Sequence, residues 1–321
     1  MNKSCRASML FSGVLCLIAH ASVGISLPTA RLTIKVVDED GLALPGMPVH
    51  VWLSESAVRD GQTDTNGIFV AEGPCTIKDI PITIAKPGYY DSKRVYSYPN
   101  YMSVEDHKWQ PWDPTVTVIV RRIVNPVQMF MKRVEAKLPI EDAPFAFDLQ
   151  AGEWVEPYGG GRLPDLCFMV TRRVTGPDDY EGTLHLTFTN AFDGIQQAEG
   201  MILESSFLFP RFAPDTGYAT NYVYSHGSDP VKGYYGARVD DPKKYHLFRV
   251  RSVMDKDGTL KQALYGILAG DIELMGVASS NSVRVAFAYF LNPTPNDRNM
   301  EFDPARNLFT NLPVAEQVRE P

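Results

Sequence analysis

Three short apolar runs with turn residues between them, within residues 34–70, limit the fold more than any other feature of this 321-residue chain. The second run is the clearest, because Val49, Val51 and Leu53 alternate with a histidine and a tryptophan. An alternation with a period of two residues is typical of a β-strand that buries one face. The three runs therefore predict three strands of a small antiparallel β-domain.

The residues between these runs have the composition of tight turns. Residues 38–41 and 64–67 share the pattern Asp-x-(Asp/Asn)-Gly, which recurs at residues 255–258. Asp and Asn form local hydrogen bonds with the backbone, and Gly adopts a positive φ without steric cost; Asn66-Gly67 further predicts a type I′ hairpin. The pattern also begins a calcium loop, but the later oxygen ligands of such a loop are missing. We therefore interpret the three motifs as strand reversals and predict no metal site.

The N-terminal part resembles a known family of small domains. Residues 41–49, 63–69 and 85–89 together are similar to carboxypeptidase regulatory-like domains. These are transthyretin-like, Ig-like β-sandwiches that occur as accessory modules of secreted bacterial proteins. The resemblance covers about residues 31–95 and implies a sandwich domain over residues 22–95 that has no catalytic residues.

The start of the chain has the features of an export signal. Lys3 and Arg6 precede an apolar run at residues 9–19, and small residues up to Ala21 supply a cleavage site. That run is shorter than the ~20 residues needed to cross a bilayer, and no later segment is a transmembrane candidate. The sequence therefore predicts a signal peptide over residues 1–21 and an exported protein, either periplasmic or extracellular.

The mature chain is expected to be acidic. Its formal charge changes from −7 to −9 when the signal peptide leaves, because two basic residues and no acidic residue are removed. Nucleic acids and anionic lipids attract clustered Lys and Arg side chains. We therefore expect no nucleic-acid partner, and a cell-surface polysaccharide or another exported protein instead.

Residues 96–114 form a predicted connection that is rich in aromatic residues and proline. Its large aromatic residues are Tyr96, Tyr98, Tyr101, Trp109 and Trp112. Free linkers lack this aromatic content, so we expect an ordered segment. Its aromatic side chains either pack between two domains or form an exposed platform that stacks on sugar rings. Packing is the favoured interpretation.

The remaining residues, 115–321, continue the pattern of short strands separated by Gly, Pro, Asn and Asp. This pattern predicts a larger antiparallel, β-sandwich-like domain, and hence an all-β protein of two domains. Residues 290–309, with 109–114 and 147–154, resemble an uncharacterised family of secreted bacterial proteins. That resemblance implies no activity.

Four aromatic residues are the candidate binding residues. They are Trp109, Trp112, Trp154 and Tyr158, which are large aromatic side chains in polar or proline-rich surroundings. A tyrosine or tryptophan presents an apolar body with a polar tip, which suits contact with a carbohydrate. We predict that they contribute to an exported, non-enzymatic binding or structural protein, associated with carbohydrate.

Two cysteines, Cys75 and Cys167, remain after removal of the signal peptide. In an oxidising compartment they could form one structural disulfide between the two domains. The alternative is two buried thiols, because a free cysteine behaves as a small hydrophobic residue. The sequence leaves both possibilities open.

Catalytic motifs give little support for an enzyme. The sequence contains no Gly-x-Ser-x-Gly motif, no His-Glu-x-x-His motif and no phosphate-binding loop, and it predicts no cofactor. A glycan hydrolase that uses a pair of carboxylates is the alternative function. Its candidate acids are Glu153, Glu156 and Asp165, and the group Asp297, Glu301 and Asp303 around Arg298. For the second group an arginine–carboxylate anchor of the C-terminal segment is the favoured interpretation.

Overall fold

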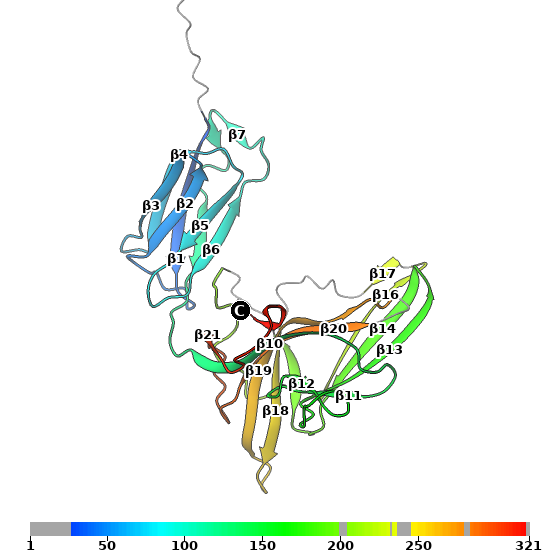
Figure 1. Cartoon of the computed structure of the whole chain (residues 1–321). Helices are drawn as coiled ribbons and strands as arrows, with labels where there is room; N and C mark the ends of the chain where they lie inside the picture. Colours follow the sequence, from blue (N-terminus) through cyan, green and yellow to red (C-terminus); the bar gives the residue numbers. More distant parts are fainter. Residues whose placement is uncertain (1–26, 199–203, 232, 236–244, 279–282, 319–321) are drawn as a thin grey trace, which may run out of the picture.

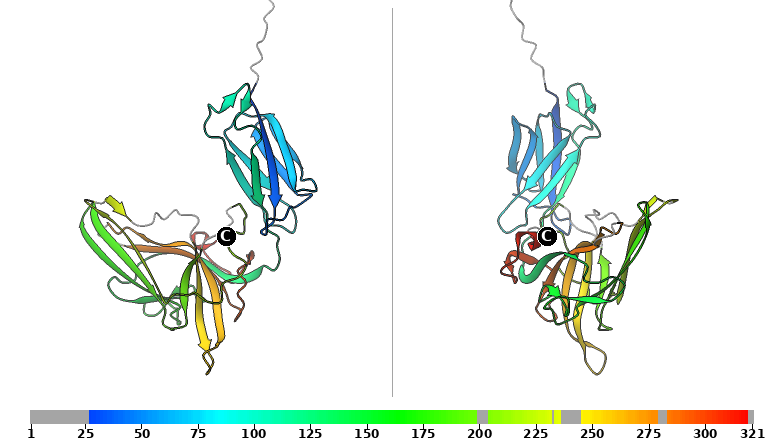
Figure 2. Two further views of the ribbon diagram at one scale, coloured as in Figure 1. Left: turned by 180° about the vertical axis from the view of Figure 1, so that it is seen from behind. Right: turned by 45° about the vertical axis from the view of Figure 1, so that its right-hand side comes forward.

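The computed structural model describes residues 27–198, 204–231, 233–235, 245–278 and 283–318. The described chain folds into β-strands with one short 3₁₀ turn, η1 (Val314–Glu316), and this confirms the all-β prediction (Figure 1). Two β-domains follow each other along the chain, as the two views in Figure 2 show. The predicted signal peptide, residues 1–21, lies outside the described residues.

The first domain is a sandwich of two sheets. One sheet contains β4 (Ile68–Pro74), β1 (Thr29–Val37), β8 (Lys108–Trp109) and β7 (Val104–Glu105), with β9 (Thr115–Ile119) also paired to β1. The other contains β3 (Ala57–Gln62), β2 (Pro48–Ser54), β5 (Asp79–Ile84) and β6 (Ser92–Ser97). The alternation at Val49, Val51 and Leu53 buries all three side chains between the sheets, as predicted.

The first domain is longer than the sequence predicts. The sequence predicts that the second domain begins at residue 115, but β9 pairs in parallel with β1 from Thr33–Thr115 to Val37–Ile119. The connection predicted at residues 96–114 likewise contributes β7 and β8 to the same sheet. The boundary between the domains therefore lies after Ile119, not near residue 95 or 114. A parallel pairing of segments that lie about 80 residues apart leaves no local pattern in the sequence.

The turn at residues 64–67 reverses the chain, but it is not the predicted hairpin. It connects β3 in one sheet with β4 in the other. The Asp64 carboxylate accepts hydrogen bonds from the N–H groups of Asn66 and Ile68, both at 2.8 Å. Only Gly67 has a positive φ, of 73°, whereas a type I′ turn needs a positive φ at both central residues. The Asp side chain therefore stabilises a crossing between two sheets.

The second domain contains two six-stranded sheets. The first has the order β15 (Gly194–Ala198), β18 (Tyr245–Met254), β19 (Leu260–Met275), β20 (Arg284–Asn292), β10 (Val127–Lys137) and β21 (Phe302–Asn307). The second has the order β12 (Glu153–Trp154), β11 (Phe145–Asp148), β13 (Leu166–Gly176), β14 (Asp179–Thr187), β16 (Asn221–Asp229) and β17 (Gly233–Tyr235). The hairpin predicted at residues 255–258 joins β18 to β19, with Gly258 at φ 83°.

The sheet that contains β18, β19 and β20 is covered on both faces. This burial on both sides explains why its strands are almost continuously apolar. One face packs on the second sheet through a cluster that includes Phe147, Phe168 and Phe287. The other face packs on a separate cluster that includes Phe207 and Phe290. The segment that carries Phe207 also contacts the first domain.

A buried arginine joins the two domains. Arg121, which follows β9, is only 2% exposed. Its guanidinium donates hydrogen bonds to the backbone carbonyls of Phe207 and Phe209 and lies 4.1 Å from the centre of the Phe207 ring. It also forms an ion pair of 2.9 Å with Glu39, from the turn that follows β1. One side chain thereby connects the first sandwich to the second domain.

A second arginine and a buried glutamate complete this joint. Arg211 forms ion pairs with Glu39 at 2.6 Å and with Glu301 at 2.9 Å. Glu301 accepts hydrogen bonds from the N–H groups of Val124 and Asn125, at 2.9 and 3.0 Å, and from a tyrosine hydroxyl of the first domain. Burial opposes the ionisation of Glu301, but these donors and Arg211 lower its pKa below the ordinary value. We call Arg121, Glu39, Arg211 and Glu301 the interdomain joint.

Removal of the central arginine should loosen the joint. Arg121→Ala leaves the Phe207 and Phe209 carbonyls without this donor and Glu39 with Arg211 as its remaining arginine, and removing one partner of a buried ion pair costs about 3 kcal/mol. We expect the free energy of unfolding in urea to fall by about that amount. The exposed Arg173, which pairs with Asp179, is the control, and Arg173→Ala should unfold like the wild type. Equal stability of the two variants would contradict the structural role of Arg121.

The lowered pKa of Glu301 predicts a dependence of stability on pH. A carboxyl group whose pKa is lower in the folded state stabilises the fold above its unfolded pKa, about 4.3. That contribution is lost as the pH falls through the folded pKa. We expect Glu301→Gln to be less stable than the wild type at pH 7, with the difference shrinking towards pH 3. A constant difference over this range, measured by urea denaturation, would exclude Glu301 as the titrating group.

Candidate functional site

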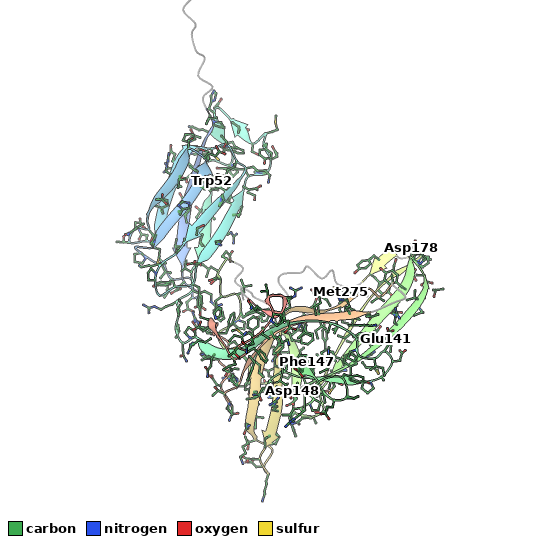
Figure 3. All side chains as sticks on the ribbon, in the orientation of Figure 1. Trp52, Glu141, Phe147, Asp148, Asp178 and Met275 are labelled. Atoms are coloured by element: carbon green, nitrogen blue, oxygen red, sulfur yellow. The ribbon has the colours of Figure 1, made fainter. Side chains whose placement is uncertain are left out.

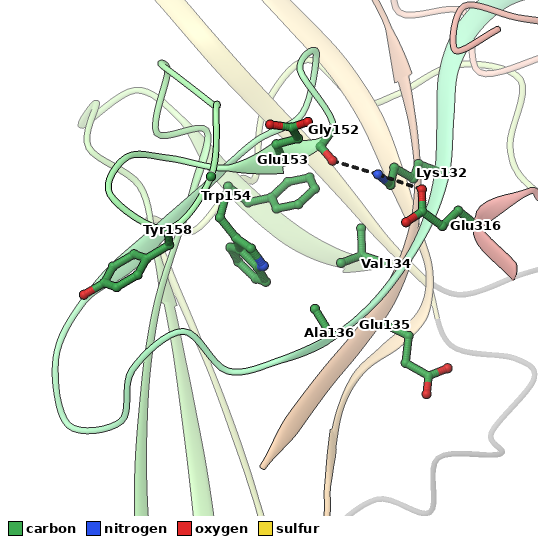
Figure 4. Close-up of a pocket in the computed structure, with 11 residues that line it drawn as sticks. Lys132, Val134, Glu135, Ala136, Gly152, Glu153, Trp154, Tyr158 and Glu316 are labelled. Carbon is green, nitrogen blue, oxygen red and sulfur yellow. Dashed lines mark hydrogen bonds and ion pairs between the residues drawn. The ribbon is translucent and has the colours of Figure 1, made fainter. Parts of the chain in front are cut away.

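A pocket of about 250 Å³ opens beside Trp154 in the second domain (Figure 4). Its walls come from β10, from β11 and β12 with the loop that follows, and from the C-terminal 3₁₀ turn. The lining residues are Lys132, Val134, Glu135, Ala136, Phe147, Gly152, Glu153, Trp154, Tyr158, Gly159 and Glu316. Two of the four predicted binding residues therefore line one pocket.

The Trp154 ring is held in place by its neighbours. Trp154 is opposite Phe147 in the pairing of β12 with β11. Its ring makes edge-to-face contacts with the rings of Phe145 and Phe147, at 5.2 and 5.0 Å between centroids. Such contacts fix the orientation of a ring as well as bury its surface. The half-buried Trp154 thus presents a fixed aromatic surface to the pocket.

The loop that carries Tyr158 closes tightly over β12. Its glycines are required, because an added Cβ at Gly159 would lie 2.5 Å from the Trp154 carbonyl, and one at Gly161 would lie 2.8 Å from the Glu153 carbonyl. The Gly161 N–H donates to the Trp154 carbonyl at 2.9 Å. The three-glycine run therefore allows backbone to pack on backbone, and it leaves Tyr158 exposed at the edge of the pocket.

The polar side of the pocket is formed by Lys132 and Glu316. The Lys132 ammonium donates to the Gly152 carbonyl at 2.9 Å and pairs with Glu316 at 2.9 Å, as the dashed lines in Figure 4 show. A second acid, Glu135, pairs with Arg284. The Glu153 carboxylate accepts a hydrogen bond of 2.9 Å from the Gly160 N–H. The rim thus offers donors and acceptors around an aromatic wall.

A buried charge cluster supports the loops that form the pocket. Arg251, with φ 56°, forms ion pairs with Asp148 at 3.0 Å and Asp165 at 2.7 Å. Burial raises the pKa of Asp165 although Arg251 opposes that change. Burial also acts on Asp148, but the backbone N–H groups of Ala151, Leu163 and Arg162 outweigh it and lower the pKa. Figure 3 places Asp148 next to Phe147 on β11, so the cluster holds the strand that carries one wall of the pocket.

The other two predicted binding residues lie in the first domain, away from this pocket. Trp109 is 3% exposed, and its indole N–H donates to the Cys75 carbonyl at 3.0 Å. Its ring lies 4.8 Å from that of Tyr98. Trp109 therefore does not form an exposed platform, which was the alternative; it packs, as the favoured interpretation has it, but inside the first sandwich and not between two domains. Trp112 is partly buried, with the Lys108 ammonium 5.0 Å from its ring centre.

Both cysteines are free thiols in the structure. Cys75 belongs to the core of the first sandwich, where its thiol donates to the Ile77 carbonyl at 3.1 Å. Cys167 lies on β13 in the second domain, and its thiol contacts the Pro164 carbonyl at 3.8 Å. Burial raises the pKa of both thiols. The structure thus favours the alternative of two separate thiols.

The two predicted groups of acids are separated by the fold. In the first group, Glu153 lines the pocket, whereas Asp165 belongs to the Arg251 cluster. In the second group, Glu301 pairs with Arg211 and not with Arg298. Glu301 does anchor the C-terminal segment through an arginine, but the sequence indicated the wrong arginine. Arg298 instead pairs with Asp215 at 2.9 Å and donates to the Ala213 carbonyl.

Two general features of the described residues bear on cofactors and membranes. No group of three or more His, Cys, Asp or Glu side chains among them could hold a metal ion. No helix in the same residues has the length and apolar character to span a bilayer.

Comparisons with known proteins give no family for this chain. No family model matches it, so the resemblance to carboxypeptidase regulatory-like domains stays a prediction. No curated protein matches it either.

Three solved structures have a partial likeness to the chain. The shaft pilin SpaA from Lactobacillus rhamnosus GG is 14% identical, with a TM-score of 0.22, over 52% of this chain and 90% of the pilin. A DUF3823 family protein from Parabacteroides merdae is 8% identical, with a TM-score of 0.22, over 82% of this chain and 96% of that one. BcpA, the major pilin subunit of Bacillus cereus, is 10% identical, with a TM-score of 0.23, over 80% of this chain and 95% of that subunit. At such scores the likeness carries no conclusion about function.

The two free thiols can be counted directly. The chain without residues 1–21 contains Cys75 and Cys167 only. When this chain is unfolded without reductant, we expect a thiol reagent to label two cysteines per molecule. If no cysteine is labelled without reductant and two are labelled after reduction, the disulfide forms instead.

Proposed function

We propose that this chain is an exported, non-enzymatic binding or structural protein of the periplasm or cell surface, and that the Trp154 pocket binds carbohydrate. The observation that carries the proposal is the aromatic surface of Trp154, fixed by Phe145 and Phe147 and surrounded by polar groups. Aromatic side chains offer the apolar contact that a sugar ring needs on its C–H face. The polar rim at Lys132 and Glu316 can exchange hydrogen bonds with hydroxyl groups.

The size of the pocket suits a small part of a glycan. Sites that enclose drug-sized ligands have volumes of about 300–1,000 Å³, and this pocket has about 250 Å³. Tyr158 stands at its edge and is 38% exposed, where it can contact a second ring. We infer a ligand of one terminal sugar on Trp154 with its neighbour on Tyr158.

The interdomain joint supports the structural part of the proposal. Four charged side chains from both domains are paired there, and two of them, Arg121 and Glu301, are each 2% exposed. Buried groups of this kind are costly to separate. The first sandwich therefore acts as a fixed extension that holds the pocket domain at a set orientation.

The glycan hydrolase is not the function that we propose. Such an enzyme needs two carboxylates on either side of the scissile bond. Of the predicted acids only Glu153 lines the pocket, and the other two carboxylates of the pocket, Glu135 and Glu316, are paired with Arg284 and Lys132. Asp165, from the same predicted group as Glu153, is 4% exposed and paired with Arg251. Glu156, the third acid, is exposed on the loop and does not line the pocket.

The proposal is tested by binding to an array of bacterial and plant polysaccharides. Tyr158→Ala removes an exposed ring that the fold does not require, and loss of one aromatic contact, worth about 1–1.5 kcal/mol, should weaken binding about tenfold. Tyr101, which is 67% exposed in the first domain, provides the matched control, and Tyr101→Ala should bind like the wild type. Absence of binding to every glycan, or an equal effect of the two substitutions, would refute the carbohydrate site.

A further inference from the structure

The charges around the pocket beside Trp154 do not balance. Its lining contains one basic and three acidic side chains, which are Lys132, Glu135, Glu153 and Glu316. Lys132 pairs with Glu316 at 2.9 Å, and Glu135 pairs with Arg284, which lies outside the lining. Two basic groups therefore neutralise two of the three acids, and the charge of the third remains.

The remaining charge belongs to Glu153. Its Oε2 atom accepts a hydrogen bond of 2.9 Å from the Gly160 N–H, which is an uncharged donor. Across the part of the chain that the structure describes, no Lys, Arg or His side chain forms an ion pair with Glu153. The side chain is exposed, so its second oxygen can accept from a ligand in the pocket.

The surroundings of the pocket add no net positive charge. Behind its wall, Arg251 faces two carboxylates, those of Asp148 and Asp165, at 3.0 and 2.7 Å. On the loop after β12, Glu156 and Arg162 are exposed, have opposite charges and do not line the pocket. The potential inside the pocket is therefore negative, and it favours a cationic ligand.

The unpaired carboxylate and the aromatic wall come from adjacent residues of β12. Successive side chains of a strand point to opposite sides, and Figure 4 shows the Glu153 carboxylate pointing away from the Trp154 ring. Both residues nevertheless line the pocket. Adjacent Cα atoms are about 3.8 Å apart, so one sugar can contact both side chains. A tryptophan ring attracts a cation more strongly than tyrosine or phenylalanine does, and the carboxylate attracts the same cation.

This arrangement distinguishes between sugars of different charge. The carboxylate of an acidic sugar would have to displace Glu316 from Lys132, and the negative potential would repel it. The hydroxyl group of a neutral sugar can donate to Glu153 but leaves its charge unbalanced. A protonated amino group balances this charge and donates up to three hydrogen bonds, which are stronger than those between neutral groups.

We infer that the ligand of this pocket is an amino sugar with a free, protonated amino group. The inference rests on the carbohydrate site proposed above and names the class of sugar that the site selects. The sugar ring packs on Trp154, its ammonium group donates to the Glu153 carboxylate, and the next sugar contacts Tyr158. Lys132 and Glu316, which neutralise each other, bind hydroxyl groups of the same sugar.

The test compares three trisaccharides that share one backbone. They are triglucosamine, its N-acetylated form chitotriose, and cellotriose, which has hydroxyl groups in place of the amines. Affinities are measured by titration calorimetry on the chain without residues 1–21, at a slightly acidic pH that protonates the amines and leaves ordinary carboxylates ionised. We expect triglucosamine to bind about fivefold more tightly than the other two, and only its affinity to fall as salt is added.

Two matched substitutions locate the charge that is responsible. Glu153→Gln removes the charge and keeps an oxygen that can accept from Gly160. It should weaken the binding of triglucosamine about fivefold and leave the binding of cellotriose unchanged. Glu156→Gln removes an equal charge from the same loop, outside the pocket, and should bind all three sugars like the wild type. If Glu153→Gln lowers the melting temperature, the salt titration of the wild type decides, and an affinity for triglucosamine that salt does not change would overturn the inference.

The remaining outcomes separate this inference from the proposed function. Equal binding of the three trisaccharides would keep the carbohydrate site and overturn the selection of an amino sugar. Equal losses in the two variants would also overturn it, because the attraction would then come from the overall charge. Trilysine has ammonium groups but no sugar ring, and binding as tight as that of triglucosamine would assign the pocket to a cationic peptide. If no trisaccharide binds, the inference fails alone when the polysaccharide array shows binding, and both proposals fail when the array shows none.

Discussion

The arrangement of the whole molecule depends on the buried guanidinium of Arg121. A charged group that is 2% exposed is costly to bury unless every donor has a partner. Here the partners are two backbone carbonyls, the Phe207 ring and Glu39, and they come from both domains. The burial of this one charge therefore requires the two domains to meet in one orientation. The ion pair between Arg211 and Glu301 holds the C-terminal segment, which carries Glu301, in the same arrangement.

A second, partly buried arginine has the corresponding role within the larger domain. Arg251 connects Asp148 and Asp165, and their carboxylates in turn accept backbone N–H groups from the loops around β11 and β12. Trp154 and Tyr158, which line the pocket, belong to this part of the chain. The pocket is thus built on a polar network that is itself fully paired, which is the condition for an ordered aromatic surface.

The sequence predicted the features that depend on neighbouring residues. The alternation at Val49–Leu53 and the Asp-Gly turn at residues 255–258 both appear as expected, because local pattern alone determines them. It did not predict the end of the first domain, because β9 pairs with a strand about 80 residues away. The burial of Trp109 follows from that same pairing, since the segment before β9 joins the first sheet and carries its tryptophan into the core. The partner of Glu301 was also missed, because Arg211 lies 90 residues from it in the chain.

The central claim, that Trp154 forms the ligand-binding surface, is tested most directly by the indole N–H signals in an NMR titration with a bound glycan. The chain has four tryptophans, Trp52, Trp109, Trp112 and Trp154, and each gives one indole signal. The account predicts that the Trp154 signal shifts with ligand concentration, while the signal of the buried Trp109 remains unchanged. A titration that shifts the Trp52 or Trp112 signal and leaves Trp154 unmoved would contradict the account.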